Sequence, residues 1–246
     1  MTRTTNRTVL RLTGADRTEF LQGLITNDIK GLSDGMIYAA MLTPQGKYLA
    51  DFFLVAEGDA ILLDVHSSLA PGLTQRLNMY KLRADVQISA TDIEPARGLS
   101  EAPEGAFPDP RHPKMGWRAY DGRPSEEEDF DAVRVAHVIP ETGIELTPDS
   151  YILEVGFERL HGVDFRKGCY VGQEVTARMK HKTELRKGLV QVSITGTAPV
   201  GSEITADGKS VGNLFTQSGG QAIAYLRFDR AKGEMTAGDA KVTWSA

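Results

Sequence analysis

The chain has 246 residues, of which 41% are hydrophobic and 25% charged, and its formal net charge is −5. This composition is typical of a folded globular protein, and the length favours two or three packed subdomains over one core. The negative charge argues against general nucleic-acid binding. No run of roughly eighteen apolar residues occurs, which excludes a spanning helix, so no membrane partner is expected.

The beginning of the chain reads as a folded segment. Residues 1–12 are rich in Thr and Arg and hold no acidic residue, a pattern that also occurs in transit peptides. Residues 8–13 already alternate like a strand, however, and leave only a handful of residues before them. We therefore expect the mature fold to begin here and the protein to be cytoplasmic.

The first half of the chain alternates strands with helices. After the strand at 8–13, residues 16–24 have helical spacing, with Asp16 as a possible N-cap and Glu19 completing a capping box. The next segments are a loop, a hairpin, a strand, a helix and a strand, at 26–35, 36–57, 60–65, 67–83 and 85–92. This order is an α+β signature.

The second half is less regular until its end. Residues 94–130 are rich in Pro, Gly and charge and predict a surface excursion or a peripheral strand pair. Helical spacing returns at 126–138 and again at 173–185. Five short runs broken by glycines then predict a small β-barrel or sandwich, at 188–195, 202–206, 210–218, 221–228 and 240–246.

Cys169 is the only cysteine, and it lies in the segment DFRKGCYVGQEVTARMKHK at 164–182. A single thiol excludes an internal disulfide and fits a reducing compartment. The five histidines are scattered without metal-site spacing. Because an iron–sulfur cluster is usually held by four cysteines, the chain alone is not expected to carry a conventional cluster, and no metal site is predicted.

The surroundings of Cys169 are typical of a reactive thiol. A thiolate is stabilised by nearby cations and by a helix N-terminus, and Arg166 and Lys167 precede the thiol while a helix follows it. Gly168 and Gly172 would let backbone N–H groups approach a ligand. A buried cysteine that only fills space in a core is the alternative.

Basic residues are concentrated around this segment. Between residues 166 and 187 there are seven Lys or Arg residues against two Glu. The pattern predicts either a solvated helix face or a basic mouth for an anionic ligand.

The octapeptide KGCYVGQE at 167–174 resembles the signature of the YgfZ family, relatives of the folate-binding aminomethyltransferase of glycine cleavage. Further segments resemble that superfamily along most of the chain. They are FLQGLITND at 20–28, LTPQGK at 42–47 with Asp51 and Phe52, YKLR at 80–83, IPE at 139–141, GVDF at 162–165, Arg178, and the glycine-broken tail.

The resemblance implies an α+β fold with two interleaved subdomains of the aminomethyltransferase folate-binding type over 1–186 and a β-barrel over 187–246. It further implies a tetrahydrofolate-binding accessory factor that assists iron–sulfur cluster assembly or repair, with the assembly machinery or client proteins as partners. Its functional candidates are Cys169 and Lys167. The expected contacts to tetrahydrofolate or a one-carbon derivative are Asp51, Tyr80, Gly172, Gln173, Glu174 and Arg178.

One departure from the aminomethyltransferases bears on activity. Their hairpin resembles NxxGGxxDD, whereas this chain has Thr43, Lys47 and Ala50-Asp51 at the corresponding positions. Proton transfer needs an acid or base near the reacting nitrogen, so enzymatic aminomethyl transfer is left open while folate binding is expected to survive. The alternatives to an accessory factor are therefore a folate-dependent one-carbon transferase and an interaction module without folate affinity.

Overall fold

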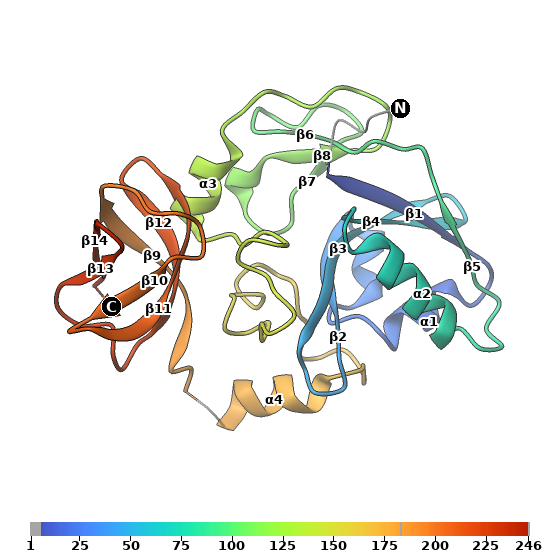
Figure 1. The fold of residues 1–246 in the computed structure, drawn as a ribbon. Helices are drawn as coiled ribbons and strands as arrows, with labels where there is room; N and C mark the ends of the chain where they lie inside the picture. Colours follow the sequence, from blue (N-terminus) through green and yellow to red (C-terminus); the bar gives the residue numbers. More distant parts are fainter. Residues whose placement is uncertain (1–5, 183, 246) are drawn as a thin grey trace. The chain divides into compact units, whose positions relative to one another are not determined.

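The computed structural model describes residues 6–182 and 184–245 (Figure 1). The chain divides into two compact units, and passes between them three times. The first unit comprises Met1–Glu128 and Glu158–Val175, and the second comprises Asp129–Phe157 and Thr176–Ala246. In the described part of the chain, no helix has both the length and the apolar character needed to cross a membrane.

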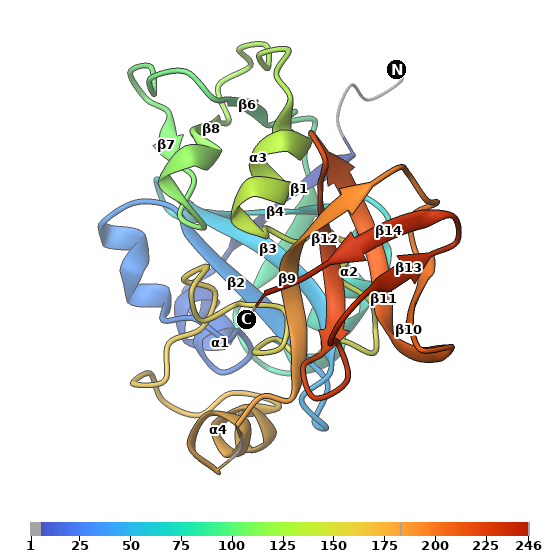
Figure 2. The same ribbon diagram turned by 90° about the vertical axis from the view of Figure 1, so that its left-hand side faces the viewer.

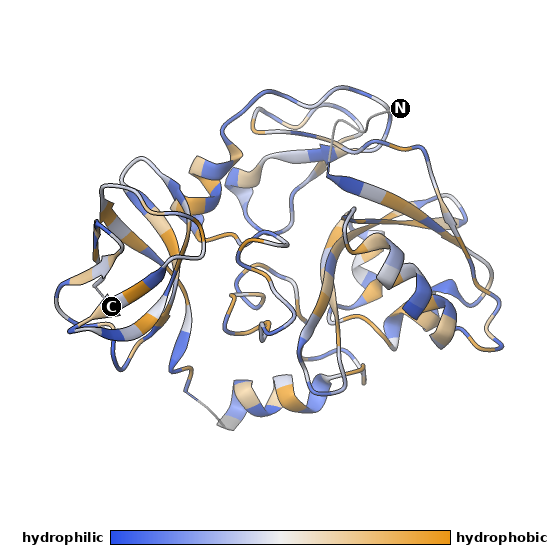
Figure 3. Ribbon diagram, viewed as in Figure 1, coloured by the Kyte–Doolittle hydropathy of each residue, from blue (hydrophilic) through white to orange (hydrophobic). Residues whose placement is uncertain are grey.

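The first unit is built on a five-stranded antiparallel sheet with the order β2-β3-β4-β1-β5. Its strands are β1 (Arg7–Thr13), β2 (Ile37–Leu42), β3 (Tyr48–Glu57), β4 (Ala60–His66) and β5 (Gln87–Ala90). The predicted hairpin at 36–57 is confirmed as β2 and β3, with Ile37 opposite Leu54 and Leu42 opposite Tyr48. Strands β2, β3 and β4 are almost entirely buried, which fits their largely hydrophobic sequences (Figure 3).

One face of this sheet packs against α1 (Arg17–Gln22) and α2 (Ala70–Tyr80) in a single hydrophobic core. Pro71 lies in the first turn of α2, where its missing N–H leaves no hydrogen bond unmade. The capping box predicted at Asp16 is wrong: its side chain makes no cap bond and instead accepts from the backbone N of Asp85 at 2.7 Å. The expected loop at 26–35 contains a short 3₁₀ helix, η1 (Ile29–Ser33).

The other face of the sheet, here called its polar face, carries the buried carboxylates of Asp51 and Asp64 among apolar side chains, and residues of the 94–130 stretch contact it. This stretch forms a three-stranded sheet from β6 (Ala96–Gly98), β7 (Phe107–Pro108) and β8 (Trp117–Ala119), with a 3₁₀ turn, η2 (Pro113–Met115), before β8. The expected peripheral strand pair is confirmed in part, since β8 pairs with both β6 and β7, whereas Asp109, Arg111 and Arg118 of this stretch are buried. Sequence periodicity missed these strands because each is only two or three residues long.

Buried ion pairs join this small sheet to the large one. Asp64 on β4 accepts from Arg118 at 3.4 Å and from the Tyr120 hydroxyl at 3.0 Å. Asp109 accepts from both Arg111 and Arg118. Burial would raise the pKa of Asp109, but the two guanidinium groups outweigh it and hold the pKa at about 2.

The second unit contains a closed six-stranded barrel with the order β10-β11-β12-β9-β14-β13 (Figure 2). Its strands are β9 (Lys187–Thr195), β10 (Glu203–Ala206), β11 (Lys209–Ser218), β12 (Gln221–Arg227), β13 (Met235–Ala237) and β14 (Ala240–Thr243). The sequence predicted five of them. It missed β13, which has three residues and of which one, Thr236, is exposed.

Two helices complete the chain. Helix α3 (Phe130–His137) packs on barrel strands of the second unit and ends where Val138 adopts a left-handed conformation. Helix α4 (Gln173–Lys182) begins in the first unit and ends in the second. The expected continuation to residue 185 is wrong, because residues 184 and 185 are not helical, and residue 183 lies outside the described residues.

Candidate functional site

The segment that carries Cys169 alternates between buried and exposed residues. Lys167 and Tyr170 are buried, whereas Gly168 and Cys169 between them are exposed. Cys169 is thus a free, solvent-accessible thiol, and the alternative of a cysteine that fills a core is excluded.

Lys167 is directed toward the end of α1. Its ammonium donates to the carbonyl oxygen of Gln22 at 2.7 Å and also to that of Ile25. Carbonyl groups at the end of a helix lack intrahelical partners, so the lysine satisfies acceptors that would otherwise need water. The Nζ atom also lies 4.9 Å from the centre of the Tyr170 ring.

The two cations expected to stabilise a thiolate have different environments. Burial lowers the pKa of Lys167 to about 8, although the carboxylates of Asp28 and Asp164 act to raise it. The side chain of Arg166 is 95% exposed and lies 3.8 Å from Asp164. The hydrogen bonds of Lys167 thus go to backbone carbonyls at the end of α1 and just beyond it. Its functional role stays a prediction.

Gly172 ties the far end of this segment to the turn of the β2–β3 hairpin. Its φ is +85°, and a Cβ at this position would lie 2.6 Å from the carbonyl oxygen of Thr43. The facing Gly46 is equally restricted, because a Cβ there would lie 2.8 Å from the Cβ of Val175. Two of the glycines near the thiol and hairpin are thus required for close backbone packing.

Hydrogen bonds to Thr26 and Asn27 hold residues 161–164, which precede the thiol. The Thr26 hydroxyl donates to the carbonyl of Gly162 at 2.6 Å, and the Thr26 backbone carbonyl accepts from the backbone N–H of Asp164 at 3.0 Å. Asn27 donates to the carbonyl of His161 at 2.7 Å, and His161 has a left-handed φ of +54°. Beside residues 161–164 lies a hollow of about 440 Å³, lined in part by Asn27, His161 and Arg166.

Asp51 lies on the polar face of the large sheet and is buried. Its Oδ1 accepts from the Tyr48 hydroxyl at 2.6 Å and its Oδ2 from the Tyr38 hydroxyl at 3.0 Å. The guanidinium of Arg111 lies over the rings of Tyr38 and Phe53, 5.6 and 4.9 Å from their centres. Burial and the Asp51 carboxylate raise the pKa of Tyr38 well above its ordinary value, against the effect of Arg111. Tyr38 therefore remains a hydroxyl donor at neutral pH.

The structure brings only some of the predicted ligand residues near Cys169. Gly172 and Gln173 lie three and four residues after the thiol, and Gln173 donates its backbone N–H to the carbonyl of Tyr170 at 3.2 Å. Glu174 and Arg178 are exposed on α4. Tyr80 is half-buried and packs against the core beneath the large sheet.

Sequence reasoning missed Tyr38 and Arg111 as neighbours of Asp51. Tyr38 had a usable signal, because it pairs with Phe53 across the hairpin and so lies on the same face as Asp51. Arg111 had none, since it lies in the stretch without periodicity.

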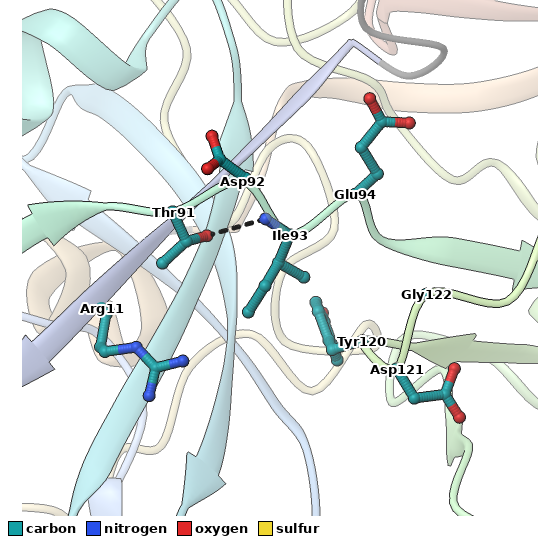
Figure 4. Close-up of a pocket in the computed structure, with 8 residues that line it drawn as sticks. All are labelled: Arg11, Thr91, Asp92, Ile93, Glu94, Tyr120, Asp121 and Gly122. Carbon is teal, nitrogen blue, oxygen red and sulfur yellow. Dashed lines mark hydrogen bonds between the residues drawn. The ribbon is translucent and has the colours of Figure 1, made fainter.

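A larger hollow of about 620 Å³ lies elsewhere in the first unit (Figure 4). It is lined in part by Asp92, Glu94 and Asp121, whose carboxylates point in different directions, and by Arg11 and Tyr120. Within residues 6–182 and 184–245, no group of three or more His, Cys, Asp or Glu residues is arranged to hold a metal ion.

Comparison with known proteins shows which family the chain belongs to. Residues 186–246 match the protein-family model described as CAF17, C-terminal beta-barrel domain. The chain is 35% identical over 239 residues to the Iron-sulfur cluster assembly factor IBA57 homolog, mitochondrial, of Mycosarcoma maydis, covering 80% of this chain and 58% of that protein. It is 30% identical over 278 residues to the mitochondrial Iron-sulfur cluster assembly factor IBA57 of Mus musculus, covering 93% of this chain and 78% of that protein. The chain belongs to the IBA57 family of iron–sulfur cluster assembly factors.

A solved structure shows that the chain has an aminomethyltransferase-like fold. The aminomethyltransferase T of the glycine cleavage system from Bartonella henselae superposes with a TM-score of 0.74 at 13% identity, covering 96% of this chain and 82% of that one. The expected α+β fold with a C-terminal barrel is thereby confirmed. The narrower YgfZ assignment stays a prediction within this related group, as does the domain boundary at 186/187.

Proposed function

We propose that this IBA57-family chain is a tetrahydrofolate-binding accessory factor that assists iron–sulfur cluster assembly or repair, with Cys169 as its functional thiol. The observation that carries the proposal is the exposure of the single cysteine on a loop whose flanks are buried. Exposure is required of a thiol that meets a partner protein or a cluster in transit. The partners are the assembly machinery or its client proteins.

A single thiol limits what the factor does to a cluster. Because a conventional cluster is held by four cysteine ligands, one exposed cysteine provides at most one ligand or one reactive sulfur. The proposed role is therefore to assist transfer or to protect an intermediate. The cluster is cargo in this scheme and not a resident cofactor.

Support for tetrahydrofolate comes from the polar face around Asp51. A buried carboxylate with two tyrosine hydroxyls offers hydrogen-bonding groups of the kind that orient a small ligand in an apolar surrounding. The basic residues after the thiol, Arg178 among them, suit the anionic glutamate tail of a folate. Gly172, Gln173 and Glu174 are proposed as further contacts, together with Tyr80.

The second candidate is a folate-dependent one-carbon transferase, favoured by the survival of Asp51 as a buried carboxylate. Both of its oxygens accept tyrosine hydroxyls, so a proton relay through Tyr38 or Tyr48 is geometrically available. Turnover of 5,10-methylenetetrahydrofolate or of an aminomethyl donor by purified protein would establish this reading. The absence of turnover with a panel of donors would exclude it.

The proposal is tested by complementation in cells that lack the native gene. Wild type is expected to restore the activity of a [4Fe–4S] enzyme, and Cys169→Ser is expected not to. Arg166→Gln is the matched control, because the Arg166 side chain is 95% exposed and lies 3.8 Å from Asp164. Full complementation by Cys169→Ser would overturn the role of the thiol.

Folate binding is tested separately by anaerobic calorimetry with tetrahydrofolate. Equal affinity in wild type and Cys169→Ala is expected, because the thiol is not among the proposed folate contacts. No binding by either protein would favour an interaction module without folate affinity.

The cytoplasmic location stays a prediction, and the mouse and fungal relatives are named as mitochondrial.

A further inference from the structure

We propose that Lys167 is a positioning residue that presents the Cys169 thiol, by clamping the base of the 167–170 loop onto the end of α1. The inference rests on the proposed function, in which Cys169 is the functional thiol. It assigns to the lysine a mechanical role instead of the electrostatic one that its position in the sequence suggested.

The loop is closed at its base by its own flanking residues. Lys167 and Tyr170 are 5% and 7% exposed, and the lysine Nζ lies 4.9 Å from the centre of the Tyr170 ring. An ammonium at this distance from an aromatic face is attracted to it. The two residues between them, Gly168 and Cys169, therefore form an exposed tip on a closed base.

The base is in turn fixed to the body of the first unit. Lys167 donates to the carbonyls of Gln22 and Ile25, which are 145 and 142 residues away in the chain. A lysine ammonium has three donors on a long stem, so one side chain reaches two carbonyls and an aromatic ring. A shorter or apolar residue would leave these carbonyls without this partner.

Independent contacts hold the chain on both sides of the clamp. Before it, the backbone N of Asp164 donates to the carbonyl of Thr26 at 3.0 Å. After it, Gly172 packs against the carbonyl of Thr43 in the β2–β3 turn. With both ends held, the clamp at Lys167 decides the path of the four residues that include the thiol.

The single cysteine makes a direct test possible on the purified chain of 246 residues. Iodoacetamide then reports one thiol, and the alkylation rate measured from pH 6 to pH 10 separates the midpoint of the profile from the plateau rate of the thiolate. Amide hydrogen exchange in residues 164–173 reports the order of the loop. The variants are Lys167→Met, Lys167→Arg and, as a matched control, Arg166→Met.

A positioning role predicts faster exchange without a changed titration. Lys167→Met is expected to raise amide exchange in 164–173 about tenfold and to leave the midpoint of the alkylation profile within about 0.3 pH units of wild type. Lys167→Arg, which retains several donors, is expected to restore at least half of the protection. Arg166→Met is expected to change neither quantity.

The opposite result would overturn the proposal. An upward shift of the midpoint by more than about 0.5 pH units in Lys167→Met, with unchanged exchange, would show that the lysine acts through its charge. If Lys167→Met does not fold, Lys167→Arg is compared with wild type instead. Its contacts to the carbonyls of Gln22 and Ile25 are expected to be shifted, which raises amide exchange in residues 164–173 alone.

This test is independent of the cellular one. If Cys169→Ser complements fully while Lys167→Met still loosens the loop, the thiol function falls and the clamp remains. If Cys169→Ser fails to complement and Lys167→Met leaves the loop protected, the clamp falls and the thiol function remains.

Discussion

Cys169 reaches solvent because its neighbours on either side are buried. Lys167 is held by backbone carbonyls and Gly172 by the hairpin turn, so local conformation at the thiol depends on residues that are not themselves reactive. Two glycines flank the cysteine closely, and their surroundings differ. This difference between Gly168 and Gly172 can be tested by replacing each with alanine.

Gly172→Ala is expected to lower the free energy of unfolding by about 2–4 kcal/mol, because it combines a left-handed φ with a backbone clash against Thr43. Gly168→Ala is the control, since no atom lies within 4 Å of a Cβ there, and a change within about 0.5 kcal/mol is expected. Urea denaturation of both variants measures the difference. Equal effects would contradict the close packing of Gly172 on the hairpin.

The stability of the folded chain is expected to depend on pH through Lys167. Its pKa is about 8 when folded, against an ordinary value of 10.5, so between these values the unfolded chain keeps a proton that the folded chain has lost. Burial of the charged form is thus unfavourable below pH 8, and this penalty is relieved as the pH rises. Urea denaturation from pH 7.5 to pH 10 should show wild type gaining on the order of 2 kcal/mol over Lys167→Met. A difference that stays flat would mean that the folded chain keeps the ammonium charged.

At the scale of elements, buried arginines join segments that hydrophobic periodicity does not connect. In the first unit Arg118 links the small sheet to β4. In the second unit Arg134 on α3 bonds to Glu145 at 2.5 Å and to the Thr216 hydroxyl on β11 at 3.3 Å. Such pairs specify where an element packs, and breaking one leaves a charge buried without its partner.

Arg134→Met is expected to lower the free energy of unfolding by about 3–5 kcal/mol, because Glu145 would remain buried without its guanidinium. Asp131 is a second partner of Arg134, and its side chain is 60% exposed. Asp131→Ala is therefore expected to lower the free energy of unfolding by less than about 0.5 kcal/mol. Thermal unfolding followed by circular dichroism compares the two. A loss below about 1 kcal/mol in Arg134→Met would show that the ion pair does not hold α3 in place.

At the scale of the whole molecule, the residues assigned to function belong mainly to the first unit. Cys169, Lys167 and Asp51 all lie there, and the β2–β3 hairpin connects them, since its turn holds Gly172 and its second strand carries Asp51. The barrel of the second unit has its own core. A ligand on the first unit is therefore expected to stabilise the chain without needing the thiol.

Tetrahydrofolate at about one hundred times its Kd is expected to stabilise wild type by about 2.7 kcal/mol, seen as a rise in Tm. Cys169→Ser is expected to show the same rise, and Asp51→Asn a smaller one because its side chain loses an acceptor for the tyrosine hydroxyls. p-Aminobenzoylglutamate, which lacks the pterin, serves as the control ligand. An equal rise in Asp51→Asn would remove Asp51 from the ligand site.

Local patterns were enough for much of the fold. Alternation predicted β1, apolar runs beside turn residues predicted β2 to β4, helical spacing predicted α2 and α3, and short glycine-broken runs predicted five of the six barrel strands. These features depend on neighbours within a few residues, which is why the chain order reveals them. The same holds for the candidate thiol, because a single cysteine between glycines and cations is visible without any coordinates.

The contacts that define the site depend on distant segments. Lys167 follows Arg166 and precedes the thiol, yet its ammonium binds carbonyls 145 and 142 residues away. Asp51 acquires Tyr38 through strand pairing and Arg111 through a stretch with no periodicity. Whether a charge tunes its neighbour or anchors a loop is decided by which groups the fold brings within hydrogen-bonding distance, and spacing along the chain does not carry that information.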